Sequence, residues 1–370
     1  MLQTMLHIPL TIEKLHELEN KKDDDMLEKK HIFECLEKNL NLKLKYEIMS
    51  MGSHGVVIYP SFSINKTSSG IITELENLNL NNDCISKILD LHNEEKKYIE
   101  KEIYFSKKLK ILDKKYENFI YPSSFEKIDS FFYNIIMKKG FDFESNLLQL
   151  NFEQLLKTLY NLVNSIQILS DNNILLLDLK PTNFLFSKID ENLYKSVIID
   201  FSGELLIENI KDFWNYLNNF EFYCHKFWPF ELTILLHRTG LKKHYNDIGE
   251  HIKEYDKMKK NKIGIKNNGY ELTIYNYLLA EIDKLKSKET SELYQKIMIY
   301  QIGKSWEYIL YRYRKSLKLT KFQYSIFNTI ISKITNESYF KRYNIQKFKT
   351  LLTKHIPELN NSLIKIDKIL

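Results

Sequence analysis

Two aspartates that each end an apolar run have the side chains and spacing that suggest chemistry. Asp178 ends the run ILLLD and Asp200 ends the run SVIID, with Lys180 and Asn183 following Asp178 on one short loop. Transfer of a phosphoryl group requires an acceptor for a hydroxyl proton, a cation for the moving phosphate and oxygen ligands for a metal ion. The spacing therefore predicts that Asp178 and Lys180 are catalytic. It also predicts that Asn183 and Asp200 bind magnesium.

Length and composition are those of an ordinary folded protein. The chain has 370 residues, enough for one large or two medium domains, with 44% hydrophobic and 28% charged residues. The net charge of +6 is modest, and almost all basic residues are lysines, whereas phosphate-binding surfaces favour arginine. The composition therefore gives no specific signal for nucleic acid.

The cysteines indicate a reducing compartment. Cys35, Cys84 and Cys224 lie far apart and form no CxxC pair, which argues against a disulfide scaffold or a zinc knuckle. No apolar run approaches the length of a membrane span, and the first residues lack the pattern of a secretory signal. We therefore expect a cytoplasmic or otherwise intracellular protein without a membrane span.

The first third of the chain changes its hydrophobic period. Residues 1–41 carry apolar side chains at helical spacing and predict a helical extension. From Leu42 the pattern alternates, turns between Gly52 and Gly55 and resumes at Val57, which predicts a β-hairpin. Glycines in such a turn let backbone amides approach a phosphate, although a plain hairpin turn is the alternative. Residues 61–83 are polar and predict an irregular connection.

A strand, a helix and a second strand are expected next. The strand CISKILD centres on Lys87, which is costly to bury without a partner, and the helix over 94–112 offers Glu102. Ordinary surface charges are the alternative for both. The apolar run SFFYNIIMKKG predicts another strand that ends at Gly140. A helix with a structural role follows from the apolar stripe Phe152, Leu155, Leu156, Leu159, Leu162, Val163, Ile166 and Leu169.

DLKPTN followed by IIDFS resembles the catalytic and metal-binding loops of eukaryotic-type protein kinases. The resemblance covers roughly residues 42–355 and implies an α+β, bilobal, protein-kinase-like fold. A small β-rich lobe with one main helix would span 42–140. A larger, mainly helical lobe would span 141–355, with an insertion at about 237–293, and 356–370 would form a tail. The divergent glycine turn and the Lys/Asn-rich composition are similar in style to kinases of large DNA viruses and AT-rich protists.

The resemblance also implies cofactors and roles. ATP and magnesium would be bound, with Lys87 on the α- and β-phosphates under orientation by Glu102, Met137 behind the adenine, and a hinge after it. The implied nucleotide-binding residues are Gly52, Gly55, Val57, Lys87, Glu102, Met137, Lys138 and Lys139. Asp178 would accept the proton of the acceptor hydroxyl. Lys180, two residues further on, resembles serine/threonine kinases and implies protein substrates with Ser/Thr acceptors.

Several positions depart from the family pattern. Leu176 and Leu177 replace the usual His-Arg pair. The family arginine pairs with a phosphate on the activation segment, which Leu177 cannot do, so we expect activity without activation-loop phosphorylation. Ser50 replaces the first glycine of the turn, and Ser202 replaces the glycine of Asp-Phe-Gly. Met298 stands where the family helix before Ile302-Gly303 usually carries an aspartate that supports the catalytic loop.

Two further features and three alternatives remain open. Glu231 in Pro-Phe-Glu and Arg342 are expected to form a structural ion pair in the second lobe. The 237–293 insertion is either a spacer or a docking element for a partner. The alternatives to a protein kinase are a small-molecule phosphotransferase of the kinase-like superfamily, a pseudokinase that acts as a binding scaffold, and a non-enzymatic interaction protein that uses the insertion.

Overall fold

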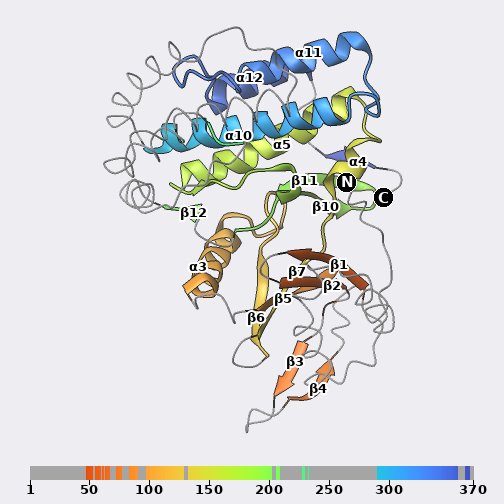
Figure 1. The fold of residues 1–370 in the computed structure, drawn as a ribbon, viewed down its shortest axis with the longest axis vertical. Helices are drawn as coiled ribbons and strands as arrows, with labels where there is room; N and C mark the ends of the chain where they lie inside the picture. Colours follow the sequence, from red (N-terminus) through yellow and green to blue (C-terminus); the bar gives the residue numbers. More distant parts are fainter. Residues whose placement is uncertain are drawn as a thin grey trace, which may run out of the picture. The chain divides into compact units, whose positions relative to one another are not determined.

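The computed structural model describes a mixed α+β chain that divides into two compact units (Figure 1). The first unit comprises Met1–Ile111 and Ile120–Lys139, and the second comprises Leu112–Phe119 and Gly140–Leu370. The described residues are 47–52, 55–59, 61, 63–66, 72–76, 83–90, 97–128, 132–201, 206–208, 227–229, 232, 290–356 and 363–366. The predicted extension over 1–41 and nearly all of the predicted 237–293 insertion lie outside these residues. The α+β class agrees with the expectation from the sequence.

A five-stranded antiparallel sheet forms the centre of the first unit, in the order β1-β2-β5-β7-β6. Its strands are β1 Glu47–Gly52, β2 Gly55–Tyr59, β5 Cys84–Asp90, β6 Pro122–Lys127 and β7 Phe132–Lys138. The β1–β2 hairpin was predicted from the alternation of apolar residues, and so were β5 and β7. The strand β6 was not predicted, because PSSFEK carries no run of alternating apolar residues.

In the part of the first unit that the structure describes, one helix and a small ribbon accompany the sheet. The helix α3, Lys97–Leu112, packs Ile99 into a core that Leu89 and Ile135 of the sheet share. The strands β3 Ser63–Lys66 and β4 Ile72–Glu76 pair with each other in an antiparallel ribbon. The expectation that 61–83 is irregular is therefore wrong for these two segments, where pairing between strands overrides the weak propensity of polar residues.

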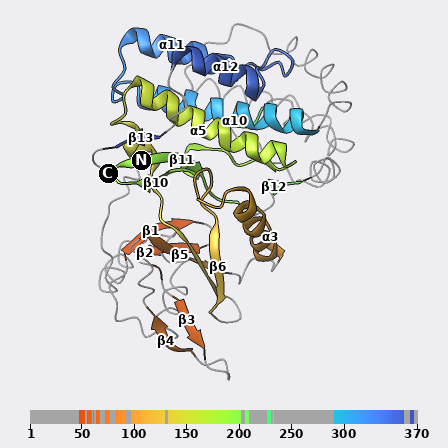
Figure 2. The same cartoon turned by 180° about the vertical axis from the view of Figure 1, so that it is seen from behind.

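Four long helices dominate the second unit (Figure 2): α5 Phe152–Asp171, α10 Thr290–Arg312, α11 Lys321–Ser332 and α12 Ile345–His355. The first of these begins with a reciprocal capping box between Asn151 and Gln154, which satisfies backbone N–H groups at the start of the helix. The predicted stripe on α5 is buried except for Phe152, which is half-buried. The helix α10 begins at Thr290, inside the last residues assigned to the insertion.

Short strands of the second unit form two antiparallel sheets. One has the order β13-β11-β10-β8, from β8 Phe141–Asp142, β10 Phe184–Asp190, β11 Leu193–Ile198 and β13 Ile364–Lys365. The other pairs β9 Leu175–Leu176 with β12 Leu206–Ile207. The described part of the unit also contains the short helix α4, Phe143–Leu147, and a 3₁₀ turn, Pro181–Asn183. The strand β13 lies within the predicted tail, 356–370.

None of the helices in the described ranges is both long enough and apolar enough to cross a bilayer.

Candidate active site

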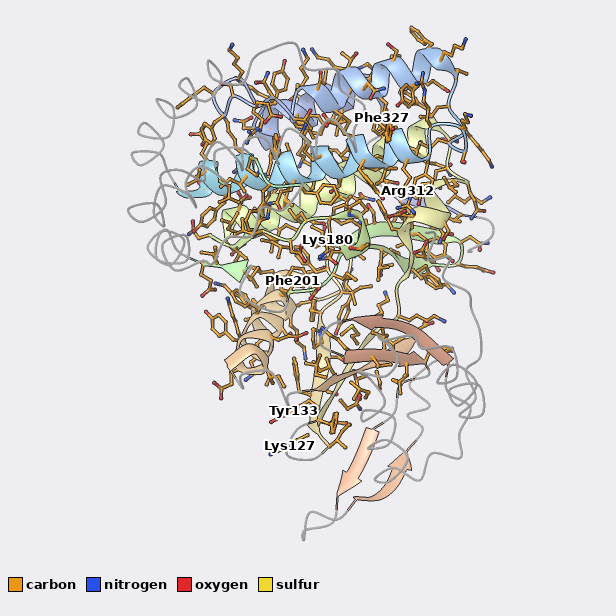
Figure 3. All side chains as sticks on the ribbon, viewed as in Figure 1. Lys127, Tyr133, Lys180, Phe201, Arg312 and Phe327 are labelled. Carbon is orange, nitrogen blue, oxygen red and sulfur yellow. The ribbon has the colours of Figure 1, made fainter. Side chains whose placement is uncertain are left out.

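The loop from 177 to 183, called here the Asp178 loop, brings three of the predicted residues together. Lys180, labelled in Figure 3, has its Nζ 2.8 Å from Asp178 Oδ2. Asn183 Nδ2 donates to the same oxygen at 2.9 Å. Asn183 Nδ2 also lies 2.9 Å from the backbone oxygen of Asp178. The Asp178 carboxylate is therefore held by an ammonium and an amide within its own loop. Its side chain keeps 16% of its surface exposed, so solvent still reaches it.

The 3₁₀ turn Pro181–Asn183 fixes the direction of the Asn183 amide. Proline occupies the first position of the turn, where its fixed φ suits the turn, and Asn183 N–H donates to Lys180 O at 2.9 Å. The Asn183 side-chain nitrogen donates to two oxygens of Asp178, the backbone oxygen and Oδ2. Both partners are acceptors, so the atom that faces them must be the amide nitrogen. The amide oxygen makes no hydrogen bond with the described residues. Asn183, only 5% exposed, thus offers one oxygen as a ligand.

Asp200 lies at the open end of the β10–β11 ribbon, next to Asn183. The ribbon pairs Phe184 with Ile198, and one step further Ile199 N–H donates to Asn183 O at 2.9 Å. Asp200 is exposed and has φ of 65°, in the left-handed region that costs most side chains energy but that aspartate tolerates. Such backbone conformations cluster at functional sites. The adjacent Phe201 is buried and anchors this end of the ribbon.

Phe201 packs edge-on against Phe119 of the segment Leu112–Phe119, with ring centroids 5.5 Å apart. Phe119 also bridges to Ile198 at the end of β11. The Asp113 carboxylate accepts three backbone N–H groups, from Glu117, Asn118 and Phe119, and so holds this turn. The segment, which lies inside the predicted 42–140 lobe, thus clusters with the second unit and supports the Asp200 end of the ribbon.

Side chains from distant parts of the second unit hold the backbone of the Asp178 loop. Gln301 on α10 accepts from Leu179 N–H at 3.3 Å and donates to Leu176 O at 3.2 Å. Trp228 Nε1 donates to Leu177 O at 2.6 Å. Gln301 was not predicted from the sequence. Only Met298, on the same helix, was noted there, at the position where the family usually carries a supporting aspartate. Met298 is buried, and Gln301 lies one turn beyond it on the same face of the helix.

In the first unit, Lys87 and Glu102 form the predicted ion pair. Lys87 Nζ lies 3.6 Å from Glu102 Oε1, with 20% and 5% of their side chains exposed. The sheet places Lys87 between Val57 of β2 and Ile135 of β7. A carboxylate as buried as that of Glu102 is retained only with charged or hydrogen-bonding partners, so the interpretation of both residues as ordinary surface charges is wrong.

The remaining predicted nucleotide-binding residues lie on the same sheet. Gly52 pairs with Gly55 at the end of the β1–β2 hairpin, although residues 53 and 54 of the turn lie outside the described residues. At the other edge of β5, Met137 pairs with Ile85, and Lys138 with Cys84. Lys139 N–H donates to Asp83 O, and its ammonium lies 3.8 Å from the centre of the Tyr59 ring. Lys138 is thus the last residue of β7, and Lys139 follows it directly.

Of the predicted Glu231–Arg342 pair, only Arg342 is among the described residues. Glu231 lies outside them, and so does Ser202. Arg342 is 2% exposed and donates from Nη1 to Lys296 O at 2.9 Å and from Nε to Asn336 O at 3.1 Å. Its guanidinium also lies 4.4 Å from the centre of the Tyr300 ring. The residue is therefore part of the core of the second unit.

The oxygen atoms of Asn183 and Asp200 suit magnesium. Within the described ranges, no three His, Cys, Asp or Glu side chains gather into a metal-binding cluster. Magnesium, however, prefers oxygen ligands and is commonly held by one or two protein groups, with substrate phosphates and water completing the shell. An amide oxygen and an exposed carboxylate on neighbouring backbone positions fit that requirement.

No protein-family model matches the sequence, and no curated protein matches it either. A function for this chain therefore has to follow from its own side chains and their geometry.

Proposed function

We propose that this protein is an ATP- and magnesium-dependent protein kinase that transfers the γ-phosphoryl group to Ser/Thr hydroxyls of protein substrates. The observation that carries the proposal is the convergence of Lys180 and Asn183 on the Asp178 carboxylate, with Asp200 beside Asn183 at the end of the ribbon. These are the proton acceptor, the cation and the two metal ligands that phosphoryl transfer requires. The proposal includes a bilobal kinase-like fold.

Asp178 would orient the acceptor hydroxyl and take its proton. The ion pair with Lys180 and the hydrogen bond from Asn183 both hold the carboxylate in place. Lys180 retains about a third of its side-chain surface, 32%, so its ammonium can also contact the phosphoryl group that is transferred. Charge that develops on that group in the transition state would be stabilised by this preorganised cation.

The proposal gives roles in nucleotide binding to residues of each unit. Lys87, oriented by Glu102, would bind the phosphates, and the glycines at the end of the β1–β2 hairpin would let the backbone approach them. Asn183 and Asp200 would hold magnesium, which supplies charge neutralisation on the phosphate oxygens. Leu177 in place of arginine supports activity that needs no activating phosphate. We also propose that 237–293 can dock a partner and that the protein is intracellular.

The proposal is tested by magnesium-dependent transfer of labelled phosphate from ATP to a mixed protein substrate and to the chain itself. Asp178→Asn is expected to lower transfer by about 10³-fold or more, because the amide cannot accept the proton. Asp190→Asn, an exposed carboxylate at the far end of β10, is the matched control and should transfer like the wild type. The label is expected on Ser or Thr.

Three results would contradict the proposal. ATP binding without transfer in a folded sample would identify a pseudokinase, and transfer to small alcohols but not to proteins would identify a small-molecule phosphotransferase. Equal transfer by the wild type and Asp178→Asn would remove Asp178 from the reaction.

A further inference from the structure

Gln301 is a fully buried amide, with 0% of its surface exposed, and both of its polar atoms bond to the Asp178 loop. Its Oε1 accepts from Leu179 N–H, directly after Asp178, and its Nε2 donates to Leu176 O, two residues before Asp178. One rigid side chain on α10 thus connects to the backbone on both sides of the proposed proton acceptor.

The backbone of this loop needs such partners. Leu176, Leu177 and Leu179 are at most 1% exposed, yet the strand β9 ends at Leu176, and among the described residues its pairing with β12 stops there. A buried backbone N–H or C=O without a hydrogen bond is costly, so side chains must replace the bonds that a strand partner would make. Gln301 supplies one acceptor and one donor to this backbone.

Neighbouring contacts make the arrangement stiff. Ser305, one turn after Gln301, has its hydroxyl 3.3 Å from Leu179 O and 2.9 Å from Gln301 O. Leu179, the residue after Asp178, is therefore held at both its N–H and its C=O from a single face of α10. The packing of α10 against α5 fixes that face within the unit.

We propose that Gln301 is a positioning residue that sets the direction of the Asp178 carboxylate by holding the backbone on both sides of it. Gln301 does not touch the reacting groups and acts through the loop. The inference rests on the proposed function, but its structural half, the anchoring of the loop, can be measured without activity.

Two substitutions separate this role from general support of the core. Gln301→Met keeps the approximate volume and removes both polar atoms. Gln301→Glu keeps an acceptor at all pH values, but only the protonated acid can donate to Leu176 O. Burial raises the pKa of such a carboxyl, so the variant can be protonated near neutral pH. Its kcat should fall as pH rises through that pKa, a titration that the wild type and Gln301→Met do not share.

The experiment compares the full-length wild type, both variants and Phe327→Leu. Phe327 is buried in α11 against Trp306 and Phe152, so its truncation lowers stability without a contact to the loop. For Gln301→Met we expect kcat to fall about 100-fold, the order that a displacement of about 1 Å costs, with the KM for ATP unchanged. Amide exchange over 174–184 should accelerate, while exchange over 155–169 stays as in the wild type. Phe327→Leu should keep its kcat below its melting temperature.

The outcomes distinguish the inference from the function it rests on. Wild-type transfer together with an unchanged kcat and unchanged loop exchange in Gln301→Met overturns the inference, as does an equal loss of kcat in Phe327→Leu. A wild type that transfers nothing, while 174–184 exchanges faster in Gln301→Met, refutes the proposed function but upholds the anchoring of the loop by Gln301.

Discussion

Charged side chains of the second unit occur in two settings, and burial decides what each can do. Lys180 and Asp178 keep part of their surface in solvent, so their charges can act on a substrate. Lys304 is only 4% exposed and lies 2.8 Å from Glu307 Oε2 and 3.6 Å from Glu337 Oε1. A buried ammonium of this kind has a structural role, because desolvation makes its charge costly unless carboxylates compensate.

The buried Lys304 ammonium leads us to predict that the folded protein loses stability at alkaline pH. Burial by itself lowers the pKa of its ammonium, but the carboxylates of Glu337 and Glu307 outweigh it and leave the pKa raised. The folded state therefore holds this proton more tightly than the unfolded state. The contribution is complete below the ordinary lysine pKa of about 10.5 and is lost as pH rises through the raised value, with a slope of at most ~1.4 kcal/mol per pH unit.

Urea unfolding between pH 9 and 11.5 checks this prediction. The free energy of unfolding of the wild type should fall more steeply than that of Lys304→Met. Lys315→Met, at an exposed site, should follow the wild type. The pKa of Tyr313 is raised by burial and by its hydrogen bond to Glu144, so Tyr313 also holds its proton more tightly in the folded state. Because Tyr313 is present in every variant, its contribution cancels in the difference. Parallel curves for wild type and Lys304→Met would contradict the assignment.

At the scale of elements, α10 is the helix that the Asp178 loop depends on, and Gly303 decides how closely it packs. A β-carbon at Gly303 would lie 2.5 Å from Thr335 Cγ2 and 2.9 Å from Ile334 Cγ1. Both neighbours are buried and β-branched, so neither can turn away easily. Gly303 lies between Gln301 and Ser305, so a shift of the helix here would move both of the loop's anchors.

Gly303→Ala is therefore expected to destabilise the second unit. Alanine gains about 1 kcal/mol in helix propensity over glycine, but overpacking a dense core costs typically ~1–3 kcal/mol and forces neighbours to move. We expect a lower melting temperature and faster amide exchange over 174–184. Thr335→Ser removes the methyl group that clashes and keeps the hydroxyl, so the double variant should recover part of the loss. An alanine variant as stable as the wild type would show that this packing is looser than it looks.

Elements differed in how far the sequence could predict them. The helix α5 was predictable because its apolar stripe is long and periodic, and the Asp178 loop because its three side chains lie within six residues. The strand β13 was not, since two residues become a strand only by pairing with β11, where Ile364 and Ile366 are buried. Gln301 was out of reach because its contact spans 122 residues and depends on the rotation of α10 about its axis.

At the scale of the whole molecule, the two units contribute different halves of the proposed chemistry. The first unit holds the Lys87–Glu102 pair and the glycine hairpin, and the second holds the Asp178 loop and Asp200. The sequence predicted both halves from local patterns. It could not predict that Leu112–Phe119 clusters with the second unit while the following Ile120–Lys139 returns to the first, because this division depends on contacts between distant segments.

Ligand-linked stability tests the roles proposed for Lys87 and Asp200. A ligand that binds only the folded state stabilises it by about 2.7 kcal/mol at 100 times its Kd, so ATP with magnesium should raise the melting temperature of the wild type by several degrees. Asp200→Asn should lose the part of the rise that depends on magnesium and keep the part due to ATP alone. Lys87→Met should lose most of both, because the phosphates lose their cation, whereas Asp190→Asn should respond like the wild type. If Asp200→Asn kept the full magnesium-dependent rise, Asp200 would not be a metal ligand, and if Lys87→Met kept the rise due to ATP, Lys87 would not bind the phosphates.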